Sequence, residues 1–223
     1  MLVSMTIRRY HRILEVLTKR QPDLSVLAED VYKPHNLSAM LRSCDAVGIG
    51  KVYAVTPTGG IPTYNETSGS AEKWVDLEVF SAVETAFATL RAQNMKVYAA
   101  HFSDEAVDYR QLDYTLPCCI LLGNERAGVS EKAASLADEH IIIPMLGMVQ
   151  SLNVSVATAV ILFEAQRQRL AAGLYDNQRL SDDTINRQMF YWLYPKEAAM
   201  LEAKGQSFPQ LREEDMKKAS SQS

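Results

Sequence analysis

Apolar runs alternate with amphipathic stretches along residues 24–170, and this alternation predicts an α/β fold. Short apolar runs at residues 24–31, 52–55, 95–100 and 117–122 are typical of buried strands. Between them, apolar residues recur every three or four positions, which predicts helices. Because strands and helices alternate, we expect a mostly parallel sheet with helices packed against it.

The two ends of the chain depart from this alternation. Residues 6–20 predict an amphipathic helix whose polar face carries five basic residues and one acidic residue. Towards the C-terminus the apolar rhythm weakens, and one further helix is predicted at residues 196–204. We therefore predict a basic N-terminal helix at residues 1–20, a central domain at residues 21–172, and a C-terminal helical extension and tail at residues 173–223.

The segment at residues 141–169 is the least ordinary part of the pattern. Three isoleucines before Pro144 predict a buried strand, and a helix is predicted to start near Ser151 and Asn153. The loop between them, residues 145–150, consists mostly of Leu, Met and Val. Loops normally face water, so we expect this one to be buried against another subunit, a ligand or another loop. Periodicity alone leaves open an ordinary strand–helix unit.

Composition narrows the class of protein. The chain has 223 residues, 47% of them hydrophobic, which suffices for a substantial core. Its net charge of -4 makes the basic helix a local feature, either a solvated helix face or a phosphate-binding patch. Three cysteines are present, and we predict that the adjacent Cys118 and Cys119 are small buried residues on opposite faces of a strand.

The same features restrict location and cofactors. No apolar run approaches the roughly 20 residues that a membrane-spanning helix needs. Cysteine usage favours a reducing, cytoplasmic compartment. No CxxC motif or Cys/His cluster indicates a metal site.

A first polar motif lies at residues 36–48. Asn36 is a good helix N-cap, and Arg42 lies beside the predicted buried stripe of the same helix. An arginine at such a position is usually part of a structural ion pair. The preceding segment, residues 32–36, lacks the glycine-rich fingerprint that a dinucleotide-binding enzyme would show there.

Two further motifs lie in the second half of the chain. The sequence GNERAG at residues 123–128 predicts a tight strand-to-helix turn with main-chain N–H groups available, and it differs from known phosphate-binding fingerprints. Glu125 in this turn either contacts substrate or pairs with a basic residue. Residues 143–157 form the third motif, in which Ser151 and Asn153 are candidates for capping the following helix.

Together and in this order, the three motifs resemble those of SpoU-type RNA 2′-O-ribose methyltransferases of the SPOUT superfamily. The resemblance covers about residues 5–210 and is strongest to the TrmH branch, whose members methylate the D-loop guanosine of tRNA at position eighteen. It implies an α/β knot, a fold with a deep C-terminal trefoil knot. It also implies S-adenosylmethionine as cofactor, tRNA as substrate, and a homodimer in which the partner completes each site. Another tRNA position, ribosomal RNA, or a non-catalytic RNA-binding module are the alternatives.

The resemblance also assigns individual residues. It implies a catalytic set formed by Arg42, Asn36, Glu125, Ser151 and Asn153. It implies a cofactor-binding set formed by Ala100, His101, Leu122, Gly123, Ile143, Met145 and Leu152. It implies RNA contacts from Arg8, Arg9, Arg12, Lys19, Arg20, Lys33 and Arg126. It further implies that residues 145–150 are tucked against the loops that follow Leu122 and Ala100.

The expected chemistry leaves one role open. A ribose 2′-hydroxyl is a very weak acid, so the site must align it with the methyl carbon and favour loss of its proton. Arg42, which matches the family's catalytic arginine, either takes part in activating the hydroxyl or binds the guanosine phosphate and stabilises the alkoxide. The loop at residues 56–65 departs from the TrmH pattern because it contains no basic residue.

Overall fold

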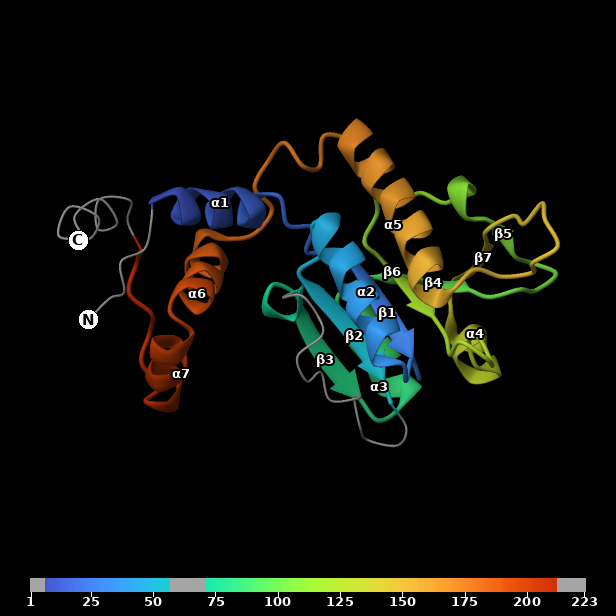
Figure 1. Ribbon diagram of the computed structural model, residues 1–223, viewed down its shortest axis with the longest axis horizontal. Coiled ribbons are helices and arrows are strands. Elements are labelled where there is room, and N and C mark those ends of the chain that lie inside the picture. The colour runs from blue at the N-terminus through green and yellow to red at the C-terminus, as the bar shows by residue number, and fades with distance from the viewer. Residues whose placement is uncertain (1–6, 57–70, 212–223) are drawn as a thin grey trace. The chain divides into compact units, whose positions relative to one another are not determined.

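The computed structural model describes residues 7–56 and 71–211, which form two compact units (Figure 1). The larger unit comprises Gln21–Leu174, and the other combines the chain up to Arg20 with the chain from Tyr175 onwards. The predicted N-terminal helix and C-terminal extension therefore belong to one unit rather than to two. Most of the loop at residues 56–65, whose missing basic residues were noted above, lies outside the described residues.

A single parallel sheet forms the centre of the larger unit. Its strands run in the order β3-β2-β1-β6-β4-β7-β5, and every pairing is parallel. The strands are β1 (Leu24–Glu29), β2 (Lys51–Val55), β3 (Asp76–Phe80), β4 (Lys96–Ala100), β5 (Val107–Asp108), β6 (Cys118–Leu122) and β7 (Glu139–Ile142). This architecture confirms the predicted α/β fold with a mostly parallel sheet. The knot that the resemblance implies stays a prediction.

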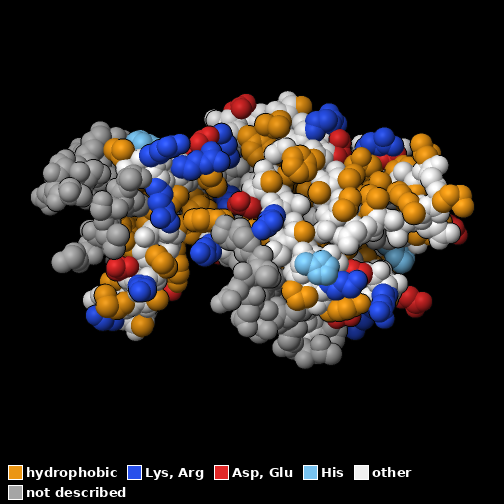
Figure 2. Space-filling view, in the orientation of Figure 1, with side chains coloured by type: hydrophobic (Ala, Val, Ile, Leu, Met, Phe, Trp, Pro, Cys, Tyr) orange, Lys and Arg blue, Asp and Glu red, His pale blue; other side chains and the backbone are white. Residues whose placement is uncertain are grey.

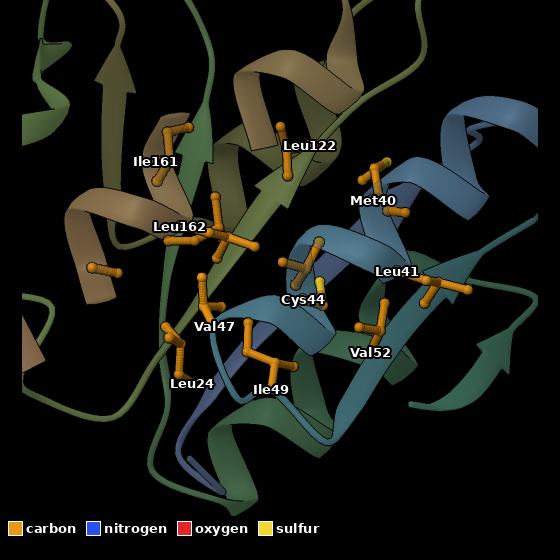
Figure 3. Close-up of a cluster of buried hydrophobic side chains, with 14 of the residues drawn as sticks. Leu24, Met40, Leu41, Cys44, Val47, Ile49, Val52, Leu122, Ile161 and Leu162 are labelled. Carbon is orange, nitrogen blue, oxygen red and sulfur yellow. The ribbon is translucent and has the colours of Figure 1, made fainter. Parts of the chain in front are cut away.

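Helices cover both faces of this sheet. They are α2 (Pro34–Ala46), α3 (Val83–Ala92), α4 (Glu131–Leu136) and α5 (Val154–Ala171), with short 3-10 turns η1 (Ala71–Lys73) and η2 (Tyr109–Gln111). Residues of α2 and α5 pack with Leu24, Val26 and Ala28 on one face (Figure 3). Residues of α3 and α4 pack with Leu27 on the other face. The alternation along β1 follows from the two-residue period of a strand, and it gives the unit two separate hydrophobic layers.

The adjacent cysteines of β6 illustrate this division. Both are fully buried and free, with Cys118 in the layer of α2 and α5 and Cys119 in the layer of α3 and α4. Burial raises the pKa of the Cys118 thiol to about 12, and it also raises the pKa of Cys119 well above its ordinary value. The prediction of small buried residues on opposite faces is confirmed.

A buried arginine fixes the C-terminal end of α5. Thr158, Leu162 and Ala165 lie on the buried face of this helix, and Arg169 continues the same stripe with 0% exposure. Its guanidinium donates to the Asp23 carboxylate at 2.6 Å, and further to the Gln21 side chain and to the main-chain oxygens of residues 23, 114 and 116. A buried charge is tolerated only when it is paired and hydrogen-bonded, as it is here.

The second unit is helical. It contains α1 (Ile7–Thr18), α6 (Asp182–Leu193) and α7 (Pro195–Ala203), which share one hydrophobic cluster built from both ends of the chain. The helix predicted at residues 196–204 is confirmed by α7, whereas α6 was not predicted. Ser181 caps α6 by accepting from Thr184 N, and Pro195 occupies the first turn of α7.

No helix within the described residues is both long and apolar enough to span a membrane. No group of three or more potential metal-ligating side chains occurs within residues 7–56 and 71–211.

Candidate active site

Side chains from three distant segments meet beyond the carboxyl ends of the central strands. Asn36, in the first turn of α2, donates from Nδ2 to Glu125 Oε1 at 2.6 Å. Its Oδ1 accepts from Asn153 Nδ2 at 3.2 Å. Asn153 Oδ1 in turn accepts from the main-chain N and the hydroxyl of Ser155. Each donor in this series points toward the Glu125 carboxylate, so the successive hydrogen bonds polarise one another and strengthen the bond to Glu125.

Asn36 does not cap α2, in contrast to the prediction. The helix begins at Pro34, with Lys33 at the N-cap position in extended conformation and no side-chain capping bond. Proline favours the first turn because its fixed φ suits a helix and its missing N–H is not needed there. The Asn36 side chain, which is 2% exposed, is thereby free to bond across to the other two segments.

Asn153 is the N-cap of α5, as predicted, because its side chain accepts from Ser155 N. Ser151 is not a cap and lies exposed two residues earlier. One side chain thus both starts the longest helix of the unit and joins the Asn36–Glu125 pair. Capping and site geometry are linked through Asn153.

The loop that carries Glu125 is closed on itself. Asn124 N donates to Gly128 O and Gly128 N donates to Asn124 O, at 2.9 and 2.8 Å. The Asn124 side chain accepts from the main-chain N of Arg126 and of Ala127. The chain passes so close to Gly123 that a Cβ there would lie 2.1 Å from Gly128 C. The prediction of free main-chain N–H groups is therefore wrong for residues 126–128.

One carboxylate oxygen in this loop has no partner. Glu125 Oε2 is shielded from solvent and accepts no hydrogen bond from the part of the chain that the structure describes. A buried, unpaired carboxylate oxygen is costly unless a donor reaches it. The geometry therefore suits a ligand that brings an N–H or O–H group to Glu125.

Arg42 lies apart from this cluster. It is exposed on the outer surface of α2, six residues after Asn36. That spacing moves it about 9 Å along the helix axis and about 240° around it. Within the described residues it makes no hydrogen bond to Asn36, Glu125 or Asn153. The structure thus brings together three of the five predicted catalytic residues and leaves Arg42 and Ser151 outside the group.

The apolar loop before α5 is open to solvent in this chain. Leu146 is 101% exposed and Met148 is 99% exposed, and Val149 is largely exposed as well. Figure 2 shows hydrophobic side chains gathered over α5 and the loop beside it. The prediction that residues 145–150 pack against the loops after Leu122 and Ala100 is wrong for residues 146–150, which are exposed, whereas Met145 is partly buried.

The predicted cofactor-binding residues lie at the carboxyl ends of three neighbouring strands. Ala100 ends β4, Leu122 ends β6, and Ile143 directly follows β7, and these strands are adjacent in the sheet. His101 N donates to Ile141 O, and its ring lies against the ring of His140. In parallel α/β sheets, ligands bind at this edge. Gly123 follows Leu122 directly, and Met145 and Leu152 are partly buried in the neighbouring loop.

Comparisons with known proteins decide the family. A sequence profile of the SpoU rRNA methylase family matches residues 23–163, and a profile for the C-terminal part of SpoU rRNA methylases matches residues 167–214. The chain belongs to the SpoU rRNA methylase family. This SpoU chain is 58% identical over 185 residues to a tRNA (guanosine(18)-2′-O)-methyltransferase of Thermus thermophilus, covering 83% of the chain and 95% of the relative.

Two solved structures are similar to this SpoU chain. The A. aeolicus TrmH/SpoU tRNA modifying enzyme has a TM-score of 0.79 and 41% identity, covering 84% of this chain and 96% of that one. An AdoMet-bound rRNA methyltransferase from Sinorhizobium meliloti has a TM-score of 0.56 and 29% identity, covering 69% and 59% of the two chains.

The predicted RNA-binding residues of the SpoU chain differ in accessibility. Arg8, Arg9 and Arg12 are exposed on α1, where Figure 2 shows Lys and Arg side chains gathered. Arg12 and Lys19 both pair with Glu15, at 2.9 and 3.0 Å. Two further candidates lie in the larger unit, where Arg126 is exposed and Lys33 is partly buried.

Arg20 contradicts the prediction of an RNA contact. Its side chain is 2% exposed, and its guanidinium lies over the Trp192 ring, 5.5 Å from the centroid. A buried guanidinium stacked on an aromatic ring contributes to packing. It is therefore not available to a phosphate in this chain.

Sequence reasoning missed the residues that support the site. Glu29 is the last residue of β1 and Asp30 follows it, and acidic residues at the carboxyl end of a strand are a recognisable signal. Arg169 extends the buried stripe of α5 at helical spacing, which also marks it as a paired buried charge. His140, which bonds Ser103 Oγ at 2.8 Å, carried no signal because a lone histidine in a strand is common.

Proposed function

We propose that this protein transfers a methyl group from S-adenosylmethionine to the ribose 2′-hydroxyl of the guanosine at position 18 of tRNA. The observation that carries the proposal is the hydrogen-bonded meeting of Asn36, Glu125 and Asn153 from the three family motifs. The similarity to tRNA (guanosine(18)-2′-O)-methyltransferases supports the reaction and its position. Free, buried cysteines are consistent with the cytoplasmic location that we also propose.

The residues present fit the methyl donor. Small or apolar side chains line the carboxyl ends of β4, β6 and β7, and the AdoMet-bound neighbour has the same fold. We assign the cofactor contacts to Ala100, His101, Leu122, Gly123, Ile143, Met145 and Leu152. When bound there, S-adenosylmethionine supplies an activated methyl group. Everything else the reaction needs must come from the protein and the RNA.

Glu125 is the group that we assign to substrate orientation. Its shielded Oε2 lacks a donor, while Oε1 is held by Asn36. A ribose hydroxyl that donates to Oε2 would satisfy the buried oxygen and would be held in a fixed orientation. Orientation of this kind lowers the barrier because the reacting atoms are aligned before reaction. Asn153 supports the arrangement through its bond to Asn36.

Arg42, on the surface of α2, is the second residue that we assign to contact with the substrate. A guanidinium stays protonated in proteins, so it suits binding of a phosphate or stabilisation of a developing alkoxide. Participation in activating the hydroxyl is the other role open to it. Because Arg42 lies away from Glu125 in one chain, the proposal requires that each site combine Glu125 of one subunit with Arg42 of another. Ser151, exposed in the same region of sequence as Asn153, is assigned to contact with the RNA.

A homodimer would also cover the exposed apolar surface. Val156, Phe163 and Leu170 are exposed on α5 at intervals of seven residues, which places them along one side of the helix. Leu146 and Met148 are exposed in the loop that precedes this helix. Several exposed apolar side chains in one region mark interaction sites. Arg8, Arg9, Arg12 and Lys19, with Lys33 and Arg126, are the residues that we assign to phosphate contacts.

Methyl transfer to defined tRNA transcripts tests the function. We expect incorporation of label from S-adenosylmethionine into a transcript with guanosine at position 18, located by mass spectrometry of nuclease fragments. A transcript with 2′-deoxyguanosine at that position should accept no methyl group, and its binding should be retained. Equal methylation of a transcript with adenosine at position 18 would refute the assigned position and favour another tRNA site.

Subunit complementation tests the shared site. Arg42→Ala and Glu125→Ala should each be inactive alone. If Arg42 serves the partner's site, mixed and re-equilibrated variants form heterodimers with one intact site, giving up to about one quarter of the wild-type rate. No recovery, in a mixture that sedimentation shows to have exchanged subunits, would place Arg42 and Glu125 in separate functions or in one subunit.

A further inference from the structure

The end of β1 holds both ends of the loop that carries Glu125. The Glu29 carboxylate accepts from Ser130 N at 2.8 Å and from Ser130 Oγ at 2.6 Å. Asn124 Nδ2 donates to Asp30 O at 3.0 Å and to Asp30 Oδ2 at 3.3 Å. Glu125 lies between these two attachment points. Two consecutive residues of one strand end thus determine where the loop begins and where it ends.

Glu29 is more than a helix cap. Ser130 already caps α4 by accepting from Ala133 N, so the helix end does not require a carboxylate. Glu29 is nonetheless buried, at 6% exposure, and it forms no salt bridge with a residue that the structure describes. A buried carboxylate is costly unless its oxygens are hydrogen-bonded, and both oxygens here bond Ser130. The arrangement fixes Ser130 in position at a cost that capping alone would not require.

Asp30 adds a strained backbone conformation to this support. Its φ of 52° lies in the left-handed region, which disfavours residues other than glycine and which aspartate tolerates better than most. In that conformation its main-chain N donates to Val55 O at 2.9 Å, while its carbonyl oxygen and its carboxylate accept from Asn124 Nδ2. Such outliers persist only where surrounding contacts enforce them.

We propose that Glu29 and Asp30 are positioning residues for methyl transfer, acting through Glu125. They hold residues 124–130 so that Glu125 Oε1 remains on Asn36 and Oε2 remains directed into the site. The inference rests on the proposed function, because the position of Glu125 affects a rate only if Glu125 contacts substrate. A misplacement of about 1 Å in such a group lowers a rate by about 100-fold.

A double-mutant cycle on the full-length protein tests the proposal. We expect Glu29→Ala to lower the single-turnover rate, at saturating S-adenosylmethionine and tRNA, by about 10- to 100-fold, with tRNA affinity unchanged. In the Glu125→Ala background the same substitution should lower the remaining rate by less than about twofold, because its effect passes through Glu125. Glu29→Gln retains a carbonyl oxygen for Ser130 N and should recover most of the rate.

Controls separate positioning from loss of stability. Ser25→Ala removes a buried hydrogen bond from the same strand, in which Ser25 Oγ donates to Lys51 O at 2.7 Å, and should leave the rate unchanged. An equal loss of rate in Ser25→Ala and Glu29→Ala would overturn the proposal. So would the same fold-loss from Glu29→Ala in both backgrounds.

If the proposed function is wrong, the wild-type protein transfers no methyl group. If only the positioning role is wrong, the wild type transfers the methyl group and Glu29→Ala is also active. If Glu29→Ala does not fold, a cycle with Asp30→Gly carries the test, because glycine keeps the left-handed backbone accessible and removes the Oδ2 acceptor for Asn124. An unchanged rate, or a loss of rate that is independent of Glu125, would then overturn the inference.

Discussion

The loop between β6 and α4 and the loop between β7 and α5 leave the same edge of the sheet, yet they are built in opposite ways. In residues 123–130, main-chain and side-chain groups bond one another and the end of β1. In residues 143–153, Leu146 and Met148 project fully into solvent. The first loop is completed by its own chain. The second loop presents apolar side chains that the described part of the chain leaves exposed.

This difference assigns separate tasks to the two loops. A loop whose polar groups are already bonded loses little further entropy on binding, so it suits the placement of a substrate-orienting group, the role proposed for Glu125. A loop with exposed Leu and Met side chains gains from burial, at about 25 cal/mol per Å² of apolar surface. It suits an interface that forms when subunits associate. Asn36 and Asn153 connect the two, because Asn153 bonds Asn36 and Asn36 bonds Glu125.

Substitution of Gly123 should have the largest effect on the loop of residues 123–130. Gly123→Ala places a Cβ 2.1 Å from main-chain atoms of Gly128, so the closed loop must open. We expect a loss of unfolding free energy of more than about 3 kcal/mol and loss of methyl transfer. Urea unfolding and single-turnover assays measure the two effects.

Gly147→Ala is the matched control in the other loop. No atom lies within 4 Å of a Cβ at Gly147, so stability at low protein concentration should change by less than about 0.5 kcal/mol. Equal losses for the two variants would show that the loop of residues 123–130 is no more constrained than the loop of residues 143–153.

Arg169→Met should destabilise the helix that follows the open loop. It leaves Asp23 without its buried partner, and main-chain oxygens at residues 114 and 116 lose their donors. Breaking a buried pair by removing one partner costs about 3–5 kcal/mol. Thermal unfolding of Arg169→Met measures this cost. Arg167→Met, which removes an exposed pair with Glu164, is the control and should lose less than about 1 kcal/mol.

The sequence predicted the fold well because the fold depends on periodic burial. Strands such as Cys118–Leu122 are continuous apolar runs, and α5 repeats its buried positions at helical spacing. The sequence predicted the cluster of Asn36, Glu125 and Asn153 less completely. That Asn36, Glu125 and Asn153 share one site followed from motif resemblance, since contacts between residues 89 and 117 positions apart have no periodic signal.

Predictions from the sequence were wrong where tertiary contacts or a competing local preference overrode a local rule. Pro34 began α2 ahead of Asn36, because proline is preorganised for the first helical turn. The resemblance implied that residues 145–150 pack against the loops after Leu122 and Ala100, but residues 146–150 are exposed. Arg20 counted as part of a charged face, yet Trp192 lies under its guanidinium. Each outcome depends on tertiary neighbours that a single sequence does not reveal.

Asn36→Asp should uncouple the two loops without unfolding either one. It replaces the donor to Glu125 Oε1, 2.6 Å away, with a carboxylate, so at neutral pH two like charges face each other with no proton between them. We expect a rate loss of about 100-fold at neutral pH. As pH falls, the protonated carboxyl can again donate to the other, so the variant's rate relative to wild type should rise. A deficit that is constant with pH would contradict the direct contact between residues 36 and 125.

Leu146→Ser should have the smallest effect on the single chain and tests whether the loop of residues 143–153 is an interface. Leu146 is 101% exposed, so its loss removes no packing within the chain, and unfolding at low protein concentration should change by less than about 0.5 kcal/mol. If the loop is an interface, the variant should dissociate at higher protein concentration than the wild type does in sedimentation equilibrium. Val79→Ser replaces an exposed apolar residue on the edge strand β3 and should leave association unchanged. Association unaffected by Leu146→Ser, or equally weakened by Val79→Ser, would contradict a role for this loop in the interface.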